Sequence, residues 1–233
     1  MAGKITAWSF SRYSAYKECP AKAKYKFVDR LKEPGSAAMD RGTDIHTKAE
    51  QYIRGNLPRI PKELVPLGGE VRRLRAAYKA APEKMLMEQT WAFTSDWQHT
   101  RWDDWNGCTL RIKVDLCEIG DDAVLITDWK TGKFRDTKAI EYQEQLELYA
   151  LGALLWFPDV AEVHTRLAYL DEGLIHPATT NVTPRKELFK LQRTWQKRSR
   201  PLLTDTKFLP TPGSACRWCH FRVGNGGPCH AGG

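Results

Sequence analysis

Apolar residues recur at the spacing of amphipathic helices through the first third of the chain. Ser9 or Ser11 can cap the first of these helices, and Glu33-Pro34-Gly35 can end it. Gly55 and Pro82 interrupt the pattern further along, at positions where helices commonly stop. The helices that we predict in this part of the chain cover about residues 9–31, 37–53 and 62–81.

The middle of the chain changes to short runs rich in Val, Ile, Leu, Thr and Trp, which are typical of strands. Gly120-Asp121-Asp122 lies between two of these runs and is typical of a hairpin turn. A strong helical pattern over residues 137–155 separates the first three runs from the last two. The predicted strands cover residues 85–97, 109–119, 122–129, 162–170 and 174–182.

A basic segment follows at Pro184, which suits the first position of a helix because its missing N–H donor is not needed there. We expect this helix to reach about Arg200, with a cysteine-rich tail after it. The order of elements predicts an α/β fold (α+β, with a mixed sheet), in which helices flank a central sheet. We expect a single domain over residues 1–233, made of a helical part (1–84), a core (85–183) and a basic helix with the tail (184–233).

Basic residues gather toward the two ends of the chain. The 36 Lys and Arg outnumber the 28 Asp and Glu, which gives a formal net charge of +8. Residues 1–62 carry 13 basic and 6 acidic side chains and residues 184–233 carry 10 and 2, whereas residues 63–183 carry 13 and 20. Basic flanks around an acidic centre fit a polyanion held at the ends and a cation between them. A soluble protein with unevenly distributed surface charge has the same pattern.

The sequence gives no sign of a membrane or a secretory route. No apolar run is long enough to span a bilayer, and the first ten residues lack the apolar stretch of a signal peptide. We therefore expect a cytoplasmic protein with no membrane partner. The chain has six cysteines, and in a reducing compartment clustered cysteines are more often metal or cluster ligands than disulfides.

Two carboxylates lie in consecutive predicted strands joined by a tight turn: Asp115 and Asp128. Antiparallel pairing can bring them to one end of the sheet, and Lys130, two residues beyond Asp128, projects from the same face. Close carboxylates both ionise readily only with a cation between them, and Mg²⁺ or Mn²⁺ suits such ligands. Lys130 would then position or help to deprotonate a water molecule beside the metal, or stabilise charge on a phosphate. The alternative is a solvated hairpin with ordinary salt bridges.

The residues around this centre resemble those of a known family. Asp128-Trp129-Lys130-Thr131-Gly132 follows the strand of Asp115, and Gln145 and Tyr149 share one face of the next helix. The combination resembles the PD-(D/E)XK nuclease superfamily and, within it, the RecB-like exonuclease branch. This resemblance implies a restriction-endonuclease-like core and a metal-dependent deoxyribonuclease that hydrolyses phosphodiester bonds.

The resemblance extends upstream and implies roles for individual residues. Arg41-Gly42-Thr43-Asp44-Ile45-His46 is similar to the Arg-Gly-Thr-x-x-His motif of the branch, whose histidine binds metal. By this resemblance, the metal ligands are His46, Asp115, Asp128 and the backbone carbonyl of Trp129. The catalytic set that it implies is Glu88, Asp115, Asp128, Lys130, Gln145 and Tyr149, of which the last two also contact DNA.

The C-terminal tail has a cysteine pattern that is typical of a metal site. Cys216 and Cys219 form Cys-x-x-Cys, and Cys229 follows. A fourth ligand is needed, and Cys19 in the first predicted helix is the candidate. The arrangement resembles RecB-like nucleases that bind an iron–sulfur cluster through one cysteine before the core and three after it. It implies a [4Fe–4S] cluster with a structural role, because the cluster would close a very long loop.

The tail departs from that pattern in one respect. The interval between Cys219 and Cys229 is longer than we expect in this branch, and His220 and His230 offer nitrogen ligands beside them. A Zn²⁺ site of the Cys₃His type is therefore an alternative. The two remaining cysteines are expected to be ordinary buried residues: Cys108 and Cys117.

The start of the chain and one polar stretch suggest contacts with DNA. Ser9, Ser11 and Arg12 resemble the Ser-x-Ser-Arg start of the branch, where hydroxyls and guanidinium suit phosphate oxygens. Capping of a helix by serine is the alternative. Three tryptophans in a polar stretch can stack on unpaired bases or pack on a neighbouring loop or partner: Trp97, Trp102 and Trp105.

Together these features predict a nuclease that acts on DNA ends or single-stranded DNA, and more specifically an exonuclease. We expect it to work in recombination, repair or phage DNA metabolism, inside a bacterial or phage-infected cell, with possible protein partners in recombination or replication. No Gly-x-x-x-x-Gly-Lys-[Ser/Thr] loop is present, so we expect no ATP motor in this chain. The alternatives are a non-catalytic DNA-binding module and an iron–sulfur redox sensor on the same fold.

Overall fold

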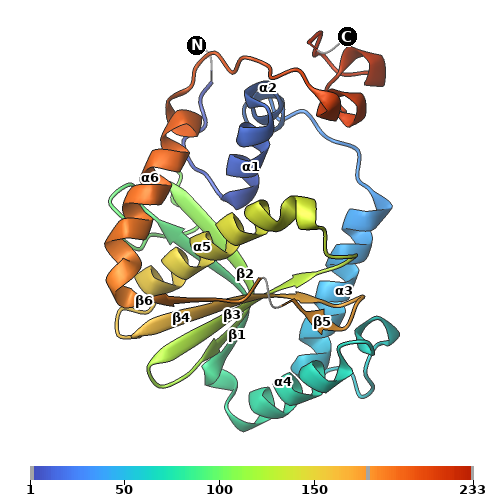
Figure 1. Cartoon of the computed structure of the whole chain (residues 1–233), viewed down its shortest axis with the longest axis vertical. Helices are drawn as coiled ribbons and strands as arrows, with labels where there is room; N and C mark the ends of the chain where they lie inside the picture. Colours follow the sequence, from blue (N-terminus) through green and yellow to red (C-terminus); the bar gives the residue numbers. More distant parts are fainter. Residues whose placement is uncertain (1–2, 177–178, 232–233) are drawn as a thin grey trace.

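The computed structural model describes residues 3–176 and 179–231, which form a six-stranded mixed sheet with helices around it (Figure 1). The strand order is β1-β2-β3-β4-β5, and β6 also pairs with β4. The first three strands form an antiparallel meander, β3 and β4 are parallel, and β5 and β6 run antiparallel to β4. The strands are β1 (Met85–Phe93), β2 (Leu110–Ile119), β3 (Ala123–Lys130), β4 (Glu162–Tyr169), β5 (Leu174–Ile175) and β6 (Asn181–Pro184).

Helices cover both faces of this sheet, which confirms the predicted α/β fold. α5 (Ala139–Trp156) connects the parallel strands β3 and β4 and packs on one face, and α6 (Leu188–Thr204) packs against α5. α3 (Ala37–Ile53) and α4 (Gly68–Ala80) cover the opposite face (Figure 1). Each face has its own apolar cluster, so the strands are buried from both sides. The predicted bounds of α3 agree with the structure because a capping serine, Ser36, precedes it.

The predicted first helix is broken at Cys19. α1 (Phe10–Glu18) ends there, α2 (Pro20–Ala23) begins one residue later, and a π-helical turn over Lys24–Val28 follows. Cys19 has an extended backbone, with φ −162° and ψ 115°. A residue before proline avoids the helical conformation, so Pro20 explains the break. The continuous helix over residues 9–31 is therefore wrong at this point.

Four other predicted boundaries are wrong. The helix expected over 62–81 is a 3₁₀ turn at Lys62–Leu64 followed by α4, and β1 ends at Phe93 because Thr94 begins a turn. Pro184 is extended, with φ −72° and ψ 150°, and ends β6 instead of beginning a helix. The strand expected over 174–182 is the two short strands β5 and β6, and residues 177–178 lie outside the described part. The remaining 3₁₀ turns are Pro82–Lys84, Asp136–Lys138, Arg185–Glu187, Ser214–Trp218 and Val223–Asn225.

The two ends of the described chain lie together at one pole of the molecule (Figure 1). The cysteine-rich tail lies beside α2, and the rings of Tyr25 and Phe221 are 5.5 Å apart. Trp8 stacks on Trp195 of α6 at 5.6 Å, and both are fully buried. Among the described residues, no helix combines the length and the apolar character that crossing a membrane requires.

Candidate active site

The hairpin of β2 and β3 brings two carboxylates to the same end of the sheet. Leu116 pairs with Thr127 in the antiparallel ladder, and the same register carries Asp115 to a position opposite Asp128. The backbone N–H of Trp129 donates a hydrogen bond to Asp115 Oδ2 at 2.8 Å. Asp115 is therefore fixed against the peptide that follows Asp128, as a tight antiparallel turn predicts.

Glu88 approaches Asp115 from the other neighbouring strand. The register of β1 with β2 places Glu88 opposite Asp115. The backbone of Glu88 lies in the left-handed region, with φ +53°. That conformation is unfavourable for a residue with a Cβ and costs on the order of 1 kcal/mol.

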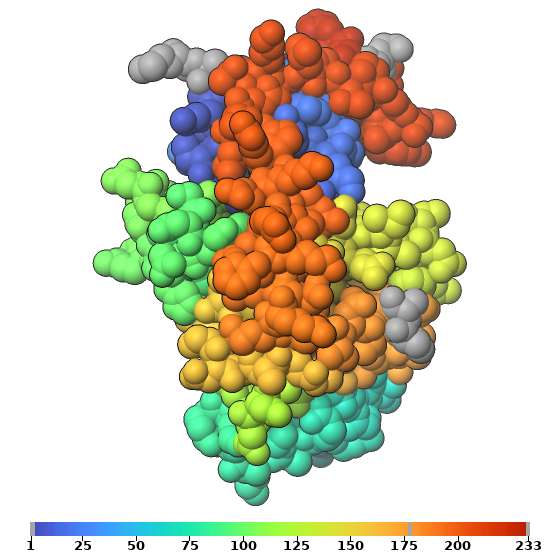
Figure 2. All heavy atoms as spheres, turned by 60° about the vertical axis from the view of Figure 1, so that its left-hand side comes forward, coloured from blue at the N-terminus to red at the C-terminus, as the bar shows by residue number. Residues whose placement is uncertain are grey.

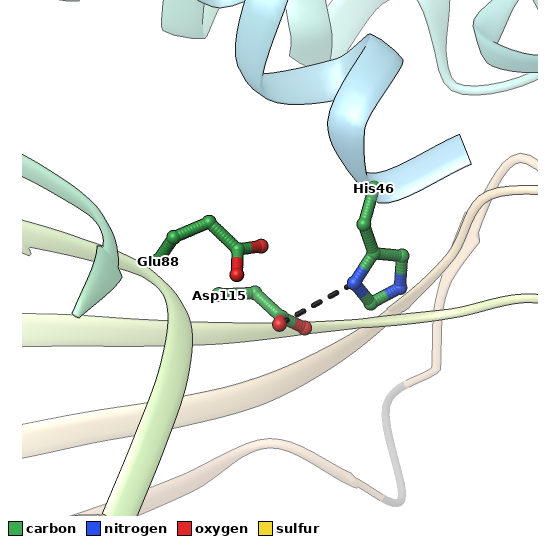
Figure 3. A group of neighbouring side chains, drawn as sticks. All are labelled: His46, Glu88 and Asp115. Carbon is green, nitrogen blue, oxygen red and sulfur yellow. Dashed lines mark ion pairs between the residues drawn. The ribbon is translucent and has the colours of Figure 1, made fainter. Parts of the chain in front are cut away.

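The unusual backbone at Glu88 coincides with a reversal of the alternation of side chains along β1. Met87 and Trp91 are four residues apart, so both would face the same side in a regular strand. Met87 instead belongs to the apolar cluster of α3 and α4, and Trp91 to the cluster of α5. The reversal at Glu88 places its carboxylate on the side from which α3 approaches (Figure 3).

His46 completes a group of three side chains that converge from three elements (Figure 3). It lies on α3, and its Nδ1 is 3.4 Å from Asp115 Oδ1. One ligand atom of each of His46, Glu88 and Asp115 lies within 4.8 Å of the other two. The edge of the imidazole meets the ring of Trp129 at 5.8 Å, which limits how the histidine can turn.

A second group lies next to the first and is centred on Asp128. Tyr149 donates a hydrogen bond to Asp128 Oδ1 at 2.8 Å, and Lys130 Nζ lies 2.7 Å from Asp128 Oδ2. Gln145 accepts a hydrogen bond from Lys130 Nζ at 2.9 Å and donates to the Tyr149 hydroxyl at 2.7 Å. The structure thus brings together the Asp-x-Lys pair of β3 and the Gln-x-x-x-Tyr pair of α5.

Burial and neighbouring charge set the protonation states in these groups. Burial raises the pKa of Asp115, and the nearby charge of Asp128 adds to this, although hydrogen bonding from His46 opposes it. Burial acts to lower the pKa of Lys130, but Asp128 outweighs it, so the pKa is raised. Burial raises the pKa of Tyr149 well above its usual value. Lys130 is therefore a cation and Tyr149 a neutral hydroxyl at neutral pH.

His46 lies within the field of several carboxylates. Burial acts to lower its pKa, but the hydrogen bond with Asp115 and the charges of Asp115, Asp128 and Glu88 raise it overall. Negative charge is therefore concentrated around His46. A divalent cation would relieve this repulsion.

The donor set fits a hard divalent ion such as Mg²⁺ or Mn²⁺. Glu88 and Asp115 offer carboxylate oxygens and His46 offers a nitrogen, and all three are only partly buried, so water can complete the shell. The buried Oδ2 of Asp128 has no directed hydrogen bond among the described residues, although Lys130 is in ion-pair range. Asp128 therefore keeps an oxygen that can still turn toward a metal.

The grouping differs in detail from the set that the sequence implies. Glu88 lies with His46 and Asp115 in the first group. The carboxylate of Asp128 is instead held by the neighbouring tyrosine, glutamine and lysine. Asp128 and the backbone carbonyl of Trp129 remain predicted ligands. The position of Glu88 could not be read from spacing alone, because it depends on the positive φ at that residue.

Two hollows meet at the catalytic groups and at the start of α1. One of about 370 Å³ is lined by Ser9, Ser11 and Arg12 together with Gln145 and Tyr149. The second, of about 460 Å³, reaches Lys130 and shares Ser11 and Gln145 with the first. The serines, the arginine, the glutamine and the tyrosine that the resemblance implies as DNA contacts therefore line one continuous surface.

Ser9 combines the two roles considered for it. Its hydroxyl accepts a hydrogen bond from the backbone N–H of Arg12 at 3.4 Å and caps α1. The hydroxyls of Ser9 and Ser11 are 3.0 Å apart and both residues line the first hollow. Ser9 can therefore cap α1 and still present its hydroxyl to the hollow.

Arg41 of the Arg-Gly-Thr motif has a partner that the sequence did not indicate. It forms a two-pronged ion pair with Asp171, at 2.9 Å and 2.5 Å. Asp171 also accepts a hydrogen bond from the backbone N–H of Gly132, just beyond Lys130. Asp171 therefore ties the start of α3 to the segment that follows the catalytic strand, and its place in an Asp-Glu-Gly turn gave no signal of this.

The four cysteines that the sequence groups line one small pocket between α2 and the tail: Cys19, Cys216, Cys219 and Cys229. The backbone N–H of Thr211 donates to Cys19 Sγ and that of Gly213 to Cys216 Sγ, each at 3.4 Å. His220 and His230 are exposed and do not line this pocket. The other two cysteines, Cys108 and Cys117, are buried as predicted.

The three tryptophans of the polar stretch divide into two kinds. Trp97 is partly buried and packs against the main core, with its backbone at φ +67°. Trp102 and Trp105 are exposed. Packing thus accounts for Trp97 and leaves the other two on the surface.

The mixed sheet, the carboxylate–histidine group and the partly buried lysine beside it are the features that a metal-dependent nuclease would need. The PD-(D/E)XK nuclease superfamily matches residues 7–223, and the chain belongs to this superfamily. A comparison with curated proteins gives no match.

One solved structure shows a similar fold at low sequence identity, and a second match has a lower TM-score. A protein named "putative exonuclease" from Eubacterium rectale is 14% identical, with a TM-score of 0.51, and the match covers 94% of this chain and 89% of that one. A protein named SSO0001 is 13% identical, with a TM-score of 0.44, over 99% of this chain and 89% of that one.

Proposed function

We propose that this chain is a Mg²⁺- or Mn²⁺-dependent deoxyribonuclease that hydrolyses phosphodiester bonds. The observation that carries the proposal is the adjacency of two groups of side chains: His46, Glu88 and Asp115, and beside them Asp128, Lys130, Gln145 and Tyr149. The first can bind a hard cation and the second presents a lysine cation next to it. Membership of a nuclease superfamily agrees with this arrangement.

The metal, when bound, would lower the pKa of a water molecule and offset negative charge on the scissile phosphate. Asp115 and Glu88 would hold it through carboxylate oxygens, and His46 through nitrogen, with Asp128 as a further ligand. Asp128 raises the pKa of Lys130, and we propose that this lysine orients water and stabilises phosphate charge as a cation. Gln145 fixes the position of the Lys130 ammonium.

The surface around the site suits a DNA strand that enters along α1. Ser9, Ser11 and Arg12 supply hydroxyls and a guanidinium for phosphate oxygens, and Gln145 and Tyr149 border the reacting groups. We propose exonuclease action on DNA ends or single-stranded DNA, as in the RecB-like branch, whose motifs the chain resembles. The same resemblance suggests a role in recombination, repair or phage DNA metabolism in the cytoplasm, alongside protein partners of those processes.

The cysteine pocket is proposed to hold a [4Fe–4S] cluster. Among the described residues, no three of its sulfurs lie within 4.8 Å of one another. Four thiolates on one zinc, with Zn–S bonds of about 2.3 Å, would lie only about 4 Å apart, whereas a cluster spreads them over four irons. The backbone N–H donors to Cys19 and Cys216 are the kind of contact that stabilises thiolates. A zinc site is the alternative.

The cluster would have a structural role and complete a single domain. It would join the helical part, residues 1–84, to the tail of the last part, residues 184–233, with the core (85–183) between them. Because the two ends of the chain are far apart in sequence, such a link removes much entropy from the unfolded state.

The direct test is digestion of end-labelled linear DNA, single-stranded and duplex, with Mg²⁺ or Mn²⁺ and with or without EDTA. We expect cleavage that depends on metal and that disappears in the Asp115→Asn variant. Closed circular DNA serves as the control for exonuclease action, because it has no ends. Cleavage that persists in EDTA, or none with either metal, would contradict the proposal and favour a non-catalytic module.

A further inference from the structure

We propose that Trp102 and Trp105, in the loop between β1 and β2, stack on unpaired bases of a DNA strand whose backbone Arg12 and Arg111 hold. The inference rests on the proposed nuclease function and deepens it, since it names a single strand as the form of DNA that enters the site. It is independent of metal and of hydrolysis, so it can be tested by binding alone.

The two tryptophans are exposed around one guanidinium. The exposed fraction is 41% for Trp102 and 78% for Trp105, whereas Trp97 of the same loop packs on the core. The Arg111 Cζ lies 5.6 Å from the ring of Trp102 and 5.1 Å from that of Trp105. Figure 2 shows the loop, in green, standing out from the body of the molecule beside α6. Exposed aromatic faces beside a cation are the usual elements of a single-strand binding surface.

The loop is held in shape by its own hydrogen bonds. The carboxylate of Asp104 accepts hydrogen bonds from the Thr100 hydroxyl at 2.7 Å and the Gly107 N–H at 2.8 Å. A Cβ at Gly107 would lie only 2.3 Å from an Asp104 oxygen, so a side chain there would displace this contact. Arg111 Nε also donates to the backbone oxygen of Trp102 at 3.0 Å. A loop ordered in advance pays less conformational entropy when a base stacks on it.

Arg12 and Arg111 leave positive charge in the hollow without a counterion. Among the described residues, neither guanidinium forms a salt bridge with a carboxylate, although both line the 370 Å³ hollow that Trp102 borders. Burial lowers the pKa of Arg12, and the nearby charge of Arg111 lowers it further. Two adjacent cations that repel each other fit a phosphate group placed between them.

The same hollow leads to the reacting groups. Gln145 and Tyr149 line it, and so does Lys113, whose ammonium lies 2.5 Å from the carboxylate of Glu88. A strand with a phosphate at Arg12 would therefore run toward Gln145 and Tyr149, which hydrogen-bond Asp128. Bases inside a duplex are stacked on their neighbours, so an unpaired strand presents many more base faces to Trp102 and Trp105 than a duplex does.

The test measures binding of fluorescein-labelled oligodeoxythymidine in EDTA, where no cleavage takes place. We expect tighter binding than to a blunt duplex, quenching of tryptophan fluorescence, and a loss of about tenfold or more in Trp102→Ala with Trp105→Ala, because each base stack contributes about 1–3 kcal/mol. Phe189→Ala removes an exposed aromatic ring of α6 and is the matched control, expected to bind as wild type. Trp102→Phe with Trp105→Phe keeps flat rings and should retain most of the affinity.

An abasic scan identifies the contact without depending on the fold of a variant. Single abasic sites are placed along the oligonucleotide, and one or two positions should weaken binding to wild type but not to the double alanine variant. Equal sensitivity in both proteins, or equal affinity of both for oligodeoxythymidine, would overturn the inference. Stacking that survives while wild-type protein fails to cleave with any metal would instead overturn the proposed nuclease function alone.

Discussion

Glu88 lies opposite Asp115 across the β1–β2 ladder with its backbone in the left-handed region, and both carboxylates reach His46. A strand would not adopt such a backbone for packing, because it reverses the alternation of side chains and costs free energy. The positive φ at Glu88 brings its carboxylate close to the ligand atoms of His46 and Asp115. If these three ligand atoms hold a metal as proposed, the strained backbone is what places the Glu88 carboxylate among them.

Two substitutions of Glu88 distinguish the effect of its strained backbone from the effect of its carboxylate as a metal ligand. Glu88→Ala and Glu88→Gly both remove the carboxylate, so both should lose metal-dependent cleavage by about 100-fold or more. Only glycine adopts φ +53° without strain, so the glycine variant should be more stable than the alanine variant by about 1 kcal/mol. Urea unfolding of the metal-free proteins measures the difference. An alanine variant at least as stable as the glycine variant would show that the backbone is not strained.

Asp115→Asn should have opposite effects on stability with and without metal. In EDTA, the substitution removes a carboxylate charge that is disfavoured there, because burial, and then the nearby charge of Asp128, raise the pKa of Asp115. The variant should therefore melt at or above the temperature of wild type. With Mn²⁺, wild type gains stability in proportion to the logarithm of the metal concentration, and the variant should gain much less. Melting curves over a series of Mn²⁺ concentrations test this, and parallel shifts of the two proteins would refute it.

The ion pair between Asp171 and Arg41 predicts a dependence of stability on pH. The hydrogen bond from Arg41 lowers the pKa of Asp171, and the N–H of Gly132 contributes to the shift. A carboxyl group whose folded pKa is depressed stabilises the protein above its unfolded pKa of about 3.9, and this contribution is lost as the pH falls through the folded value. Wild type should be more stable than Asp171→Asn at pH 7, and the difference should shrink below about pH 4.

Asp121→Asn provides the control for that comparison. Asp121 is an exposed carboxylate of the β2–β3 turn, in an ion pair with Lys84 only. Its substitution should change the free energy of unfolding little at either pH. If Asp171→Asn and Asp121→Asn changed the free energy of unfolding equally at both pH values, the link between α3 and Gly132 would contribute nothing to stability.

The cysteine pocket predicts a loss of both iron and stability when one ligand is removed. Anaerobically purified wild type should contain about four irons per chain, and Cys19→Ser should contain fewer than one. The variant should also melt at a lower temperature, since the chain ends are no longer joined. Cys108→Ala, at a buried cysteine away from the pocket, should keep its iron. If wild type instead contained one zinc and no iron per chain, the cluster proposal would be wrong and the zinc site would be favoured.

The sequence predicts most of the fold because its signals are local. Alternating strands, the hairpin turn at Gly120 and the cap before α3 are each determined by neighbouring residues, and their elements were predicted. The break at Cys19 also has a local cause, Pro20, and could have been predicted from it. The placement of Pro184 was wrong because proline's φ suits a strand end as well as a helix start.

The site was harder to predict where it depends on long-range geometry. The Asp-x-Lys spacing indicates one face of β3, and the ion pair of Asp128 with Lys130 agrees with it. Nothing local indicates that Glu88 turns to a positive φ, or that Asp171 crosses to Arg41 from 130 residues away. These contacts arise only when the sheet and α3 are assembled.

The central claim is that Lys130 acts as a cation on a metal-bound substrate, and one measurement tests it most directly. Single-turnover cleavage of labelled single-stranded DNA is followed in Mn²⁺ for wild type, Lys130→Ala and Lys133→Ala, whose lysine is exposed on the next segment. We expect a rate about 100-fold to 1,000-fold lower for Lys130→Ala, with DNA binding largely retained, and a wild-type rate for Lys133→Ala. Equal rates for wild type and Lys130→Ala would contradict it.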